Sequence, residues 1–239
     1  MSSDADYKAL VAEGRRILGG VRIGRPGRSQ LYWTLFPPAQ ILRLRYRIRV
    51  HGRSHVEKGP AILVGNHLSL LDPVLVGIAN RFRVTFFTKV EVFERIGAIF
   101  FRWTGQIPIR RGDEASTKWA LEMAADAVAQ GAKLSIYPEG TRSTDGVTLH
   151  RLHRRVLIPV LQANATVPVH AMTIAYTDKR LWRQNVEIRF SQRLTIDIDE
   201  KSADEITQEI TEALIELGDM PYEHTFSRIH TSARESTRW

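Results

Sequence analysis

Hydrophobic and polar residues recur with a period of two near residue 45, which is typical of a half-buried strand. One face of this segment, residues 42–50, is apolar and comprises Leu42, Leu44, Tyr46, Ile48 and Val50. The opposite face is basic and comprises Arg43, Arg45, Arg47 and Arg49. Such a charged face either binds phosphates or protects an edge strand from aggregation, and the pattern favours neither interpretation.

Downstream of this segment, short apolar runs alternate with stretches of helical periodicity. The runs predict strands at residues 61–65, 84–88, 107–109, 133–137, 167–176 and 186–190. Helices are predicted at residues 73–80, 90–104, 113–130, 149–163 and 203–217. The alternation predicts an α/β domain whose mixed, largely parallel sheet is flanked by helices.

The first forty residues have a different pattern. Residues 4–18 predict an amphipathic helix that begins at Asp4 as N-cap and ends at Gly19-Gly20. A short apolar piece follows and ends at Pro37-Pro38; its aromatic residues are Tyr32, Trp33 and Phe36. We therefore expect residues 1–40 to form an amphipathic membrane-docking segment, residues 41–220 the main domain, and residues 221–239 a loosely ordered tail.

The distribution of charge supports a docking role for the N-terminal region. The net charge is +8, and residues 1–55 carry all of the excess, with 11 basic and three acidic residues. An excess of this kind suits lipid headgroups, nucleic acid or an acidic carrier protein. Aromatic residues beside a basic loop favour an anionic membrane, although they can equally cover the core of the domain. The neutral remainder of the chain disfavours a nucleic-acid-binding groove.

The amino-acid composition excludes several kinds of site and of membrane attachment. The chain has no cysteine, which excludes disulfides, thiolate-ligated metals and a thiol nucleophile. No stretch reaches the roughly 20 apolar residues of a spanning helix, and the acidic first residues do not resemble a signal peptide. We expect a cytoplasmic protein that lies peripherally on the inner face of the cell membrane.

The strongest chemical signal follows the predicted strand at residues 61–65. There, His67 and Asp72 form a candidate pair in which the carboxylate orients the imidazole as a general base. Ser69 lies between them, so a hydrolase triad is conceivable, but the Gly-x-Ser-x-Gly turn of an α/β-hydrolase is missing. The simpler alternative is a structural histidine with Asp72 as a helix N-cap.

Three further segments fall at strand ends and can converge on the same site. They are residues 105–111, which end in Arg110-Arg111, residues 137–143 (Tyr-Pro-Glu-Gly-Thr-Arg-Ser), and Val167-Pro168-Val169. Arg111 and Arg142 can each make forked bonds to a phosphate. Gly140 permits a close approach of the backbone to a substrate.

These four blocks, in this order, resemble those of the glycerolipid acyltransferase family over roughly residues 45–190. His67 and Asp72 match the family's His–Asp spacing of five positions, and residues 137–143 match its Phe-Pro-Glu-Gly-Thr-Arg-Ser block with Tyr for Phe. Two places depart from the family pattern. Residues 149–155 lack a glycine-containing Phe-Lys segment, and His170 stands where an apolar residue is usual.

The resemblance implies transfer of an acyl group from acyl-CoA or acyl-carrier protein to the free hydroxyl of 1-acylglycerol-3-phosphate, which gives phosphatidic acid. It implies His67 as base, Asp72 as its orienting partner, and no metal or cofactor beyond the acyl donor. The implied substrate-binding residues are Arg111, Glu139, Gly140, Thr141 and Arg142, with Glu139 positioning Arg142 or the glycerol hydroxyls. Other acceptors remain open: glycerol 3-phosphate, a headgroup-bearing lysophospholipid or a lyso-aminolipid. The roles of His150, His153 and His170 also remain open.

Overall fold

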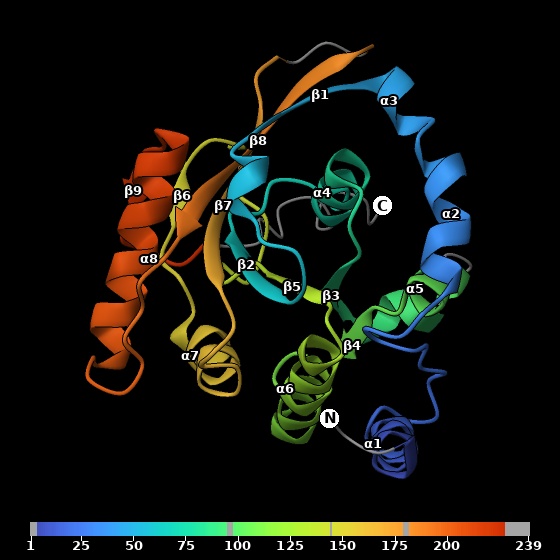
Figure 1. The fold of residues 1–239 in the computed structure, drawn as a ribbon. Coiled ribbons are helices and arrows are strands. Elements are labelled where there is room, and N and C mark those ends of the chain that lie inside the picture. The colour runs from blue at the N-terminus through green and yellow to red at the C-terminus, as the bar shows by residue number, and fades with distance from the viewer. Residues whose placement is uncertain (1–3, 95–97, 144, 179–181, 228–239) are drawn as a thin grey trace, which may run out of the picture.

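The computed structural model describes residues 4–94, 98–143, 145–178 and 182–227. Its centre is a seven-stranded sheet in the order β1-β8-β7-β2-β5-β3-β4 (Figure 1). Neighbouring strands are parallel except for the antiparallel pair β7 and β8. The strands are β1 (Tyr46–His51), β2 (Ala61–Gly65), β3 (Val84–Lys89), β4 (Ile107–Ile109), β5 (Lys133–Ile136), β7 (Val169–Tyr176) and β8 (Gln184–Arg193). The predicted mixed, largely parallel sheet is confirmed.

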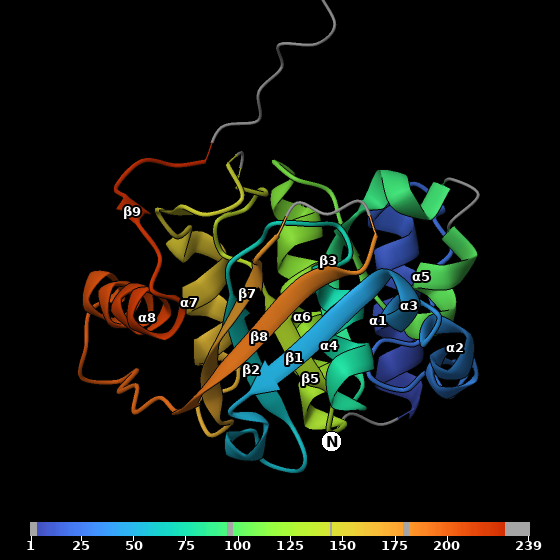
Figure 2. The ribbon, with the colours of Figure 1, turned by 90° about the horizontal axis from the view of Figure 1, so that it is seen from above.

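Helices cover both faces of this sheet (Figures 1 and 2). They are α1 (Asp4–Ile17), α2 (Leu31–Ala39), α3 (Leu42–Arg45), α4 (Asp72–Asn80), α5 (Ala98–Thr104), α6 (Glu114–Ala129), α7 (Arg154–Gln162) and α8 (Ala203–Gly218). Two short 3₁₀ segments are η1 (Arg53–His55) and η2 (Val90–Glu94). All five residues of β2 are buried, and its alternate side chains enter two cores. One core contains residues of α6, α7 and α8, and the other contains residues of α4.

Two predicted elements begin later than their patterns suggest. Residues 42–45 form the helical turn α3, and the strand starts only at Tyr46, where its partner β8 begins at Gln184. A strand needs hydrogen bonds to a neighbouring strand. In α3, the Arg43 guanidinium instead donates to the Gln40 side chain and to the Ile78 carbonyl. Residues 149–163 were expected to be one helix, but α7 starts at Arg154 because β6 (Leu149–His150) pairs with β9 (Tyr222–Glu223).

The predicted helix at residues 90–104 is also divided. It consists of η2 and α5, while residues 95–97 lie outside the described part. Of the predicted tail, residues 221–239, only residues 221–227 lie within the described part. There, β9 pairs with β6, and the Arg151 N–H donates to the Thr225 carbonyl at 3.0 Å.

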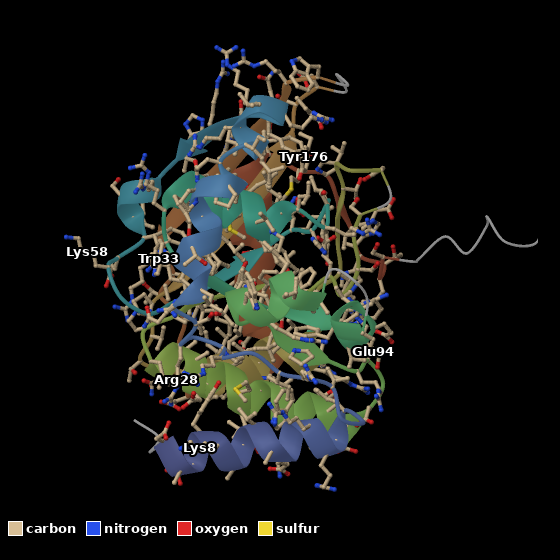
Figure 3. The ribbon with its side chains drawn as sticks, turned by 90° about the vertical axis from the view of Figure 1, so that its right-hand side faces the viewer. Lys8, Arg28, Trp33, Lys58, Glu94 and Tyr176 are labelled. Atoms are coloured by element: carbon tan, nitrogen blue, oxygen red, sulfur yellow. The ribbon has the colours of Figure 1, made fainter. Side chains whose placement is uncertain are left out.

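The helix α1 buries its apolar face within the protein. Tyr7 is buried, and the Trp119 indole of α6 donates to the Leu10 carbonyl at 2.8 Å. Lys8, on the outer side of α1, is solvent-exposed (Figure 3). The apolar face predicted for membrane docking is thus used for packing in this helix. In the described residues, no helix has the length and apolar character needed to cross a membrane.

The helix α2 is packed on one side only. The Tyr32 hydroxyl donates to the Phe82 carbonyl at 3.2 Å, so this aromatic residue faces the domain. Phe36 is partly buried beside it, whereas Trp33 is 44% exposed. Of the three aromatic residues predicted to dock on a membrane, Trp33 is therefore the one that solvent reaches most.

Candidate active site

The pair predicted at residues 67 and 72 is formed. His67 Nδ1 lies 2.9 Å from Asp72 Oδ2, and Asp72 is completely buried at the first turn of α4. The same Oδ2 accepts the backbone N–H groups of Leu68 and Ser69, both at 2.7 Å. Asp72 thus binds the loop before α4 and does not cap that helix. With Nδ1 donating to the carboxylate, the His67 Nε2 lone pair is available to take a proton.

Tyr176 completes the environment of this carboxylate. Its hydroxyl donates to Asp72 Oδ1 at 2.7 Å. Tyr176 ends β7, which neighbours β2, and 104 positions separate it from Asp72. Sequence reasoning missed it, and its one available signal was its place at the end of a predicted strand.

Two other residues that sequence reasoning missed fix the loop carrying His67. The Asn66 side chain donates to the Ile174 carbonyl at 3.0 Å and accepts the Ile174 N–H at 2.9 Å, which ties the end of β2 to β7. The Tyr137 ring stacks on His67, with centroids 4.7 Å apart and an interplanar angle of 29°. The imidazole is therefore held from its carboxylate side and from one face.

Glu139 connects two segments of the site through backbone bonds. Its Oε1 accepts the His67 N–H at 3.0 Å, and its Oε2 accepts the His150 N–H at 3.1 Å. Burial raises the pKa of Glu139 to about 7, although both of these bonds oppose the shift. Its partners within the described residues are thus main-chain groups, and Arg142 is not among them. The other predicted role of Glu139, positioning the glycerol hydroxyls, stays a prediction.

A cavity of about 770 Å³ opens beside His67. Its basic lining comprises Lys89 at the end of β3, Arg111 after β4, and Arg155 on α7. Glu139, Gly140 and Thr141 also line it, as predicted for the substrate site. Arg142 is exposed on the adjoining loop and lies outside this lining. The cavity combines one histidine base with three cationic side chains, which suits an anionic substrate carrying a reactive hydroxyl.

Gly140 is required by its surroundings. Its φ is 71°, and a Cβ atom there would lie 2.8 Å from Cδ2 of the His153 ring. His153 in turn stacks on Phe226 with centroids 4.3 Å apart. The pKa of His153 is lowered, chiefly by burial and next by the charge of Arg111.

His170 and Ser69 both lie within hydrogen-bond distance of main-chain groups. His170 is buried at the start of β7, where its Nδ1 lies 3.2 Å from the Ser191 carbonyl, away from the strand ends that carry His67. Ser69 Oγ accepts the Leu71 N–H at 3.2 Å within the loop. In the part of the chain that the structure describes, no three acidic or histidine side chains are arranged to hold a metal ion.

Comparison with known proteins identifies a family that matches this chain. The acyltransferase family model matches residues 47–175. A chloroplast 1-acyl-sn-glycerol-3-phosphate acyltransferase of Arabidopsis thaliana is 32% identical over 104 residues, which cover 42% of this chain and 29% of that protein. A 1-acyl-sn-glycerol-3-phosphate acyltransferase of Chlamydomonas reinhardtii is 33% identical over 103 residues, 42% of this chain and 31% of its own length. The matched part thus spans less than a third of these relatives.

A solved structure extends the likeness in fold. The crystal structure of the 1-acyl-sn-glycerophosphate acyltransferase PlsC from Thermotoga maritima superposes with a TM-score of 0.54. The match covers 90% of this chain and 81% of that chain, at 20% sequence identity. At this identity the likeness concerns the fold.

Proposed function

This chain belongs to the acyltransferase family, and from that premise we propose that it transfers a fatty acyl group from a thioester to the free hydroxyl of 1-acylglycerol-3-phosphate. The observation that carries the proposal is the His67–Asp72 pair beside a cavity with three cationic side chains. In this proposal, the histidine removes the proton of the acceptor hydroxyl, and the cationic side chains bind the acceptor phosphate. The named activity of the relatives supports this choice of acceptor over glycerol 3-phosphate or other lysolipids.

In the proposed reaction, His67 Nε2 removes the proton of the acceptor hydroxyl as its oxygen attacks the thioester carbonyl. A carbon–oxygen bond forms, the carbon–sulfur bond breaks, and the imidazolium returns its proton to the departing thiolate. Asp72 stabilises the imidazolium at 2.9 Å throughout. A thiolate leaves readily, so the mechanism needs no acyl-enzyme, and the absence of cysteine agrees with this.

We assign the acceptor's phosphate to Arg111, with Lys89 and Arg155 as further contacts, because all three line the cavity with His67. Arg142 was predicted as a phosphate contact, but it lies outside the lining of this cavity, which includes Arg155, and this supports Arg155 in that role. Gly140 and Thr141 line the same cavity. The lack of a side chain at Gly140 lets the backbone approach the reacting thioester closely.

The proposed acceptor is a lipid, so we further propose that the protein docks on an anionic membrane. Several of its most exposed large apolar side chains lie on α3, on the His67–Asp72 loop and after β7: Leu44 (61%), Leu70 (71%) and Trp182 (67%). A ring contact of 6.3 Å between Tyr46 and Tyr176 places the end of α3 near Asp72. Apolar insertion and the basic N-terminal region would act together.

The test is release of free thiol from palmitoyl-CoA by purified protein, with and without 1-acylglycerol-3-phosphate. Because the chain has no cysteine, a thiol-reactive dye detects the product without labelling the protein. We expect release that depends on the acceptor and that falls by about 10²–10⁴-fold in His67→Ala. A matching melting temperature for the two proteins would show that the variant is folded.

The outcomes of this experiment are distinct. Release without acceptor would identify a thioesterase and refute acyl transfer to a lipid. Near-normal release by His67→Ala would remove this histidine from the mechanism. Glycerol 3-phosphate, tested in parallel, separates the proposed acceptor from its nearest alternative.

A further inference from the structure

A second cavity, of about 760 Å³, shares the lining residues His153 and Arg155 with the first. It is lined by residues from the start of α7, from α8, and from the C-terminal segment at residues 222–226. Arg151, Arg154 and His224 line this cavity and are absent from the lining of the first.

This second cavity is strongly basic. It contains the guanidinium groups of Arg151, Arg154 and Arg155 against the single carboxylate of Asp204. Asp204 is engaged by Arg154 at 2.5 Å. Within the described residues, Arg151 has no ion-pair partner, and Arg155 is shared with the first cavity. The second cavity thus keeps the positive charge of Arg151, which suits a phosphorylated ligand.

The C-terminal segment holds Arg151 in place. The guanidinium carbon lies 5.0 Å from the centre of the Phe226 ring, and the same ring stacks on His153 at 4.3 Å. The Arg151 N–H also donates to the Thr225 carbonyl. Residues 151–155, which belong to the segment that departs from the family pattern, thus line the second cavity, and His153 and Arg155 line both cavities.

The two substrates of the proposed reaction carry their phosphates at different distances from the reacting atoms. In 1-acylglycerol-3-phosphate the phosphate lies a few bonds from the attacking hydroxyl. In a pantetheine thioester the phosphate is separated from the sulfur by the whole pantetheine arm. The second cavity, which shares the lining residues His153 and Arg155 with the first, offers a separate position for the phosphate of the donor.

We propose that the second cavity binds the phosphate end of the pantetheine thioester donor, with Arg151 as a contact. The inference rests on the proposed function, because it assigns the donor of that reaction. Coenzyme A and acyl-carrier protein both bring a phosphate next to pantetheine, and coenzyme A adds an adenosine 3′-phosphate.

Binding is measured by calorimetry with two probes, adenosine 3′,5′-bisphosphate and 4′-phosphopantetheine. Arg151→Gln should weaken binding by about 10-fold or more, the loss expected for one charge-assisted bond. Arg151→Lys should keep most of the affinity. The matched control is Arg193→Gln, which should bind the probes like the wild type. Arg193 is exposed at the end of β8, where it pairs with His170 at the start of β7.

The two probes distinguish the donors. Adenosine bisphosphate binding that depends on Arg151 identifies coenzyme A, and dependence confined to phosphopantetheine identifies a carrier protein. If neither probe loses affinity in a folded Arg151→Gln protein, or if neither binds the wild type, the site is refuted. These binding measurements need no turnover. The donor site can therefore be refuted while thiol release still shows acyl transfer, and acyl transfer can be refuted while the probes still bind.

Steady-state kinetics add a crossed comparison. Arg151→Gln should raise the KM for palmitoyl-CoA about 10-fold and leave the KM for the acceptor unchanged. Arg111→Gln, in the first cavity, should raise the KM for the acceptor and leave the KM for palmitoyl-CoA unchanged. Equal effects of Arg151→Gln on both KM values would contradict a separate donor site.

Discussion

Two buried carboxylates of the site differ in the donors that reach them. Asp72 is approached by two backbone N–H groups, the His67 ring and the Tyr176 hydroxyl. Glu139 has two backbone N–H donors, from His67 and His150, and burial raises its pKa to about 7. Asp72 is thus held by these donors against the His67 ring, whereas Glu139 serves as a link between main-chain segments.

This difference predicts a pH dependence of stability. The pKa of Glu139 rises from 4.5 to about 7 on folding, so the folded state binds more protons between these values. The free energy of unfolding should therefore decrease as pH rises from 4.5 to 7, by at most about 3 kcal/mol, and then level off.

Urea unfolding of the wild type and Glu139→Gln from pH 4.5 to 8 isolates this contribution. The variant has no titrating group at position 139, so its stability should fall less over the same range. Equal pH slopes in the two proteins would show that Glu139 titrates in the folded state as it does in the unfolded chain.

The elements around the sheet show how local pattern and packing interact. The alternation covers residues 42–50, yet the strand covers only residues 46–51, and its described pairing with β8 begins at Tyr46 and Gln184. Amphipathic periodicity predicts α1 well, but it does not say that the apolar face meets α6. A single position decides how closely these two helices approach. Gly14 lies directly against the Trp119 ring, which a Cβ atom would overlap.

Gly14→Ala should therefore destabilise the protein by about 1–3 kcal/mol through overpacking, despite the better helix propensity of alanine. Chemical denaturation measures the change. The matched test is the same substitution in a Trp119→Phe background, where the smaller ring leaves room and the cost should be lower. An equal cost in both backgrounds would mean that the two side chains do not clash.

At the scale of the whole molecule, charge and exposed apolar side chains are distributed unevenly. The excess positive charge lies in residues 1–55, while α1 uses its apolar face internally. The exposed apolar residues Trp33, Leu44 and Trp182 remain as candidates for contact with a lipid surface. The docking surface proposed here therefore includes side chains near the active site as well as α2.

Leu44→Ser combined with Trp182→Ser should weaken sedimentation with phosphatidylglycerol-containing vesicles by about 10-fold, because less apolar area is inserted. Trp33→Ser tests the α2 contribution separately. High salt should weaken binding of all variants, and neutral vesicles are the control. Unchanged binding by both the double variant and Trp33→Ser would refute these side chains as the docking surface.

Features that depend on neighbours along the chain can be predicted from the amino-acid sequence. Buried strands and amphipathic helices follow from hydrophobic periodicity, and the His67–Asp72 contact spans only five positions, within one loop and the first turn of a helix. The lack of cysteine excluded thiol chemistry directly from composition. The strand ends carrying Arg111 and Glu139 were predicted to converge because the ends of parallel strands share an edge.

Which distant residues meet at that edge depends on how the elements pack in three dimensions. Tyr176 reaches Asp72 across 104 positions, Glu139 bonds to main chain, and Arg155 lines the cavity from which Arg142 is absent. The second cavity needs α7, α8 and the C-terminal segment together. Periodicity records which side of an element is buried but carries no information about its partner, so these contacts depend on sheet order and helix packing.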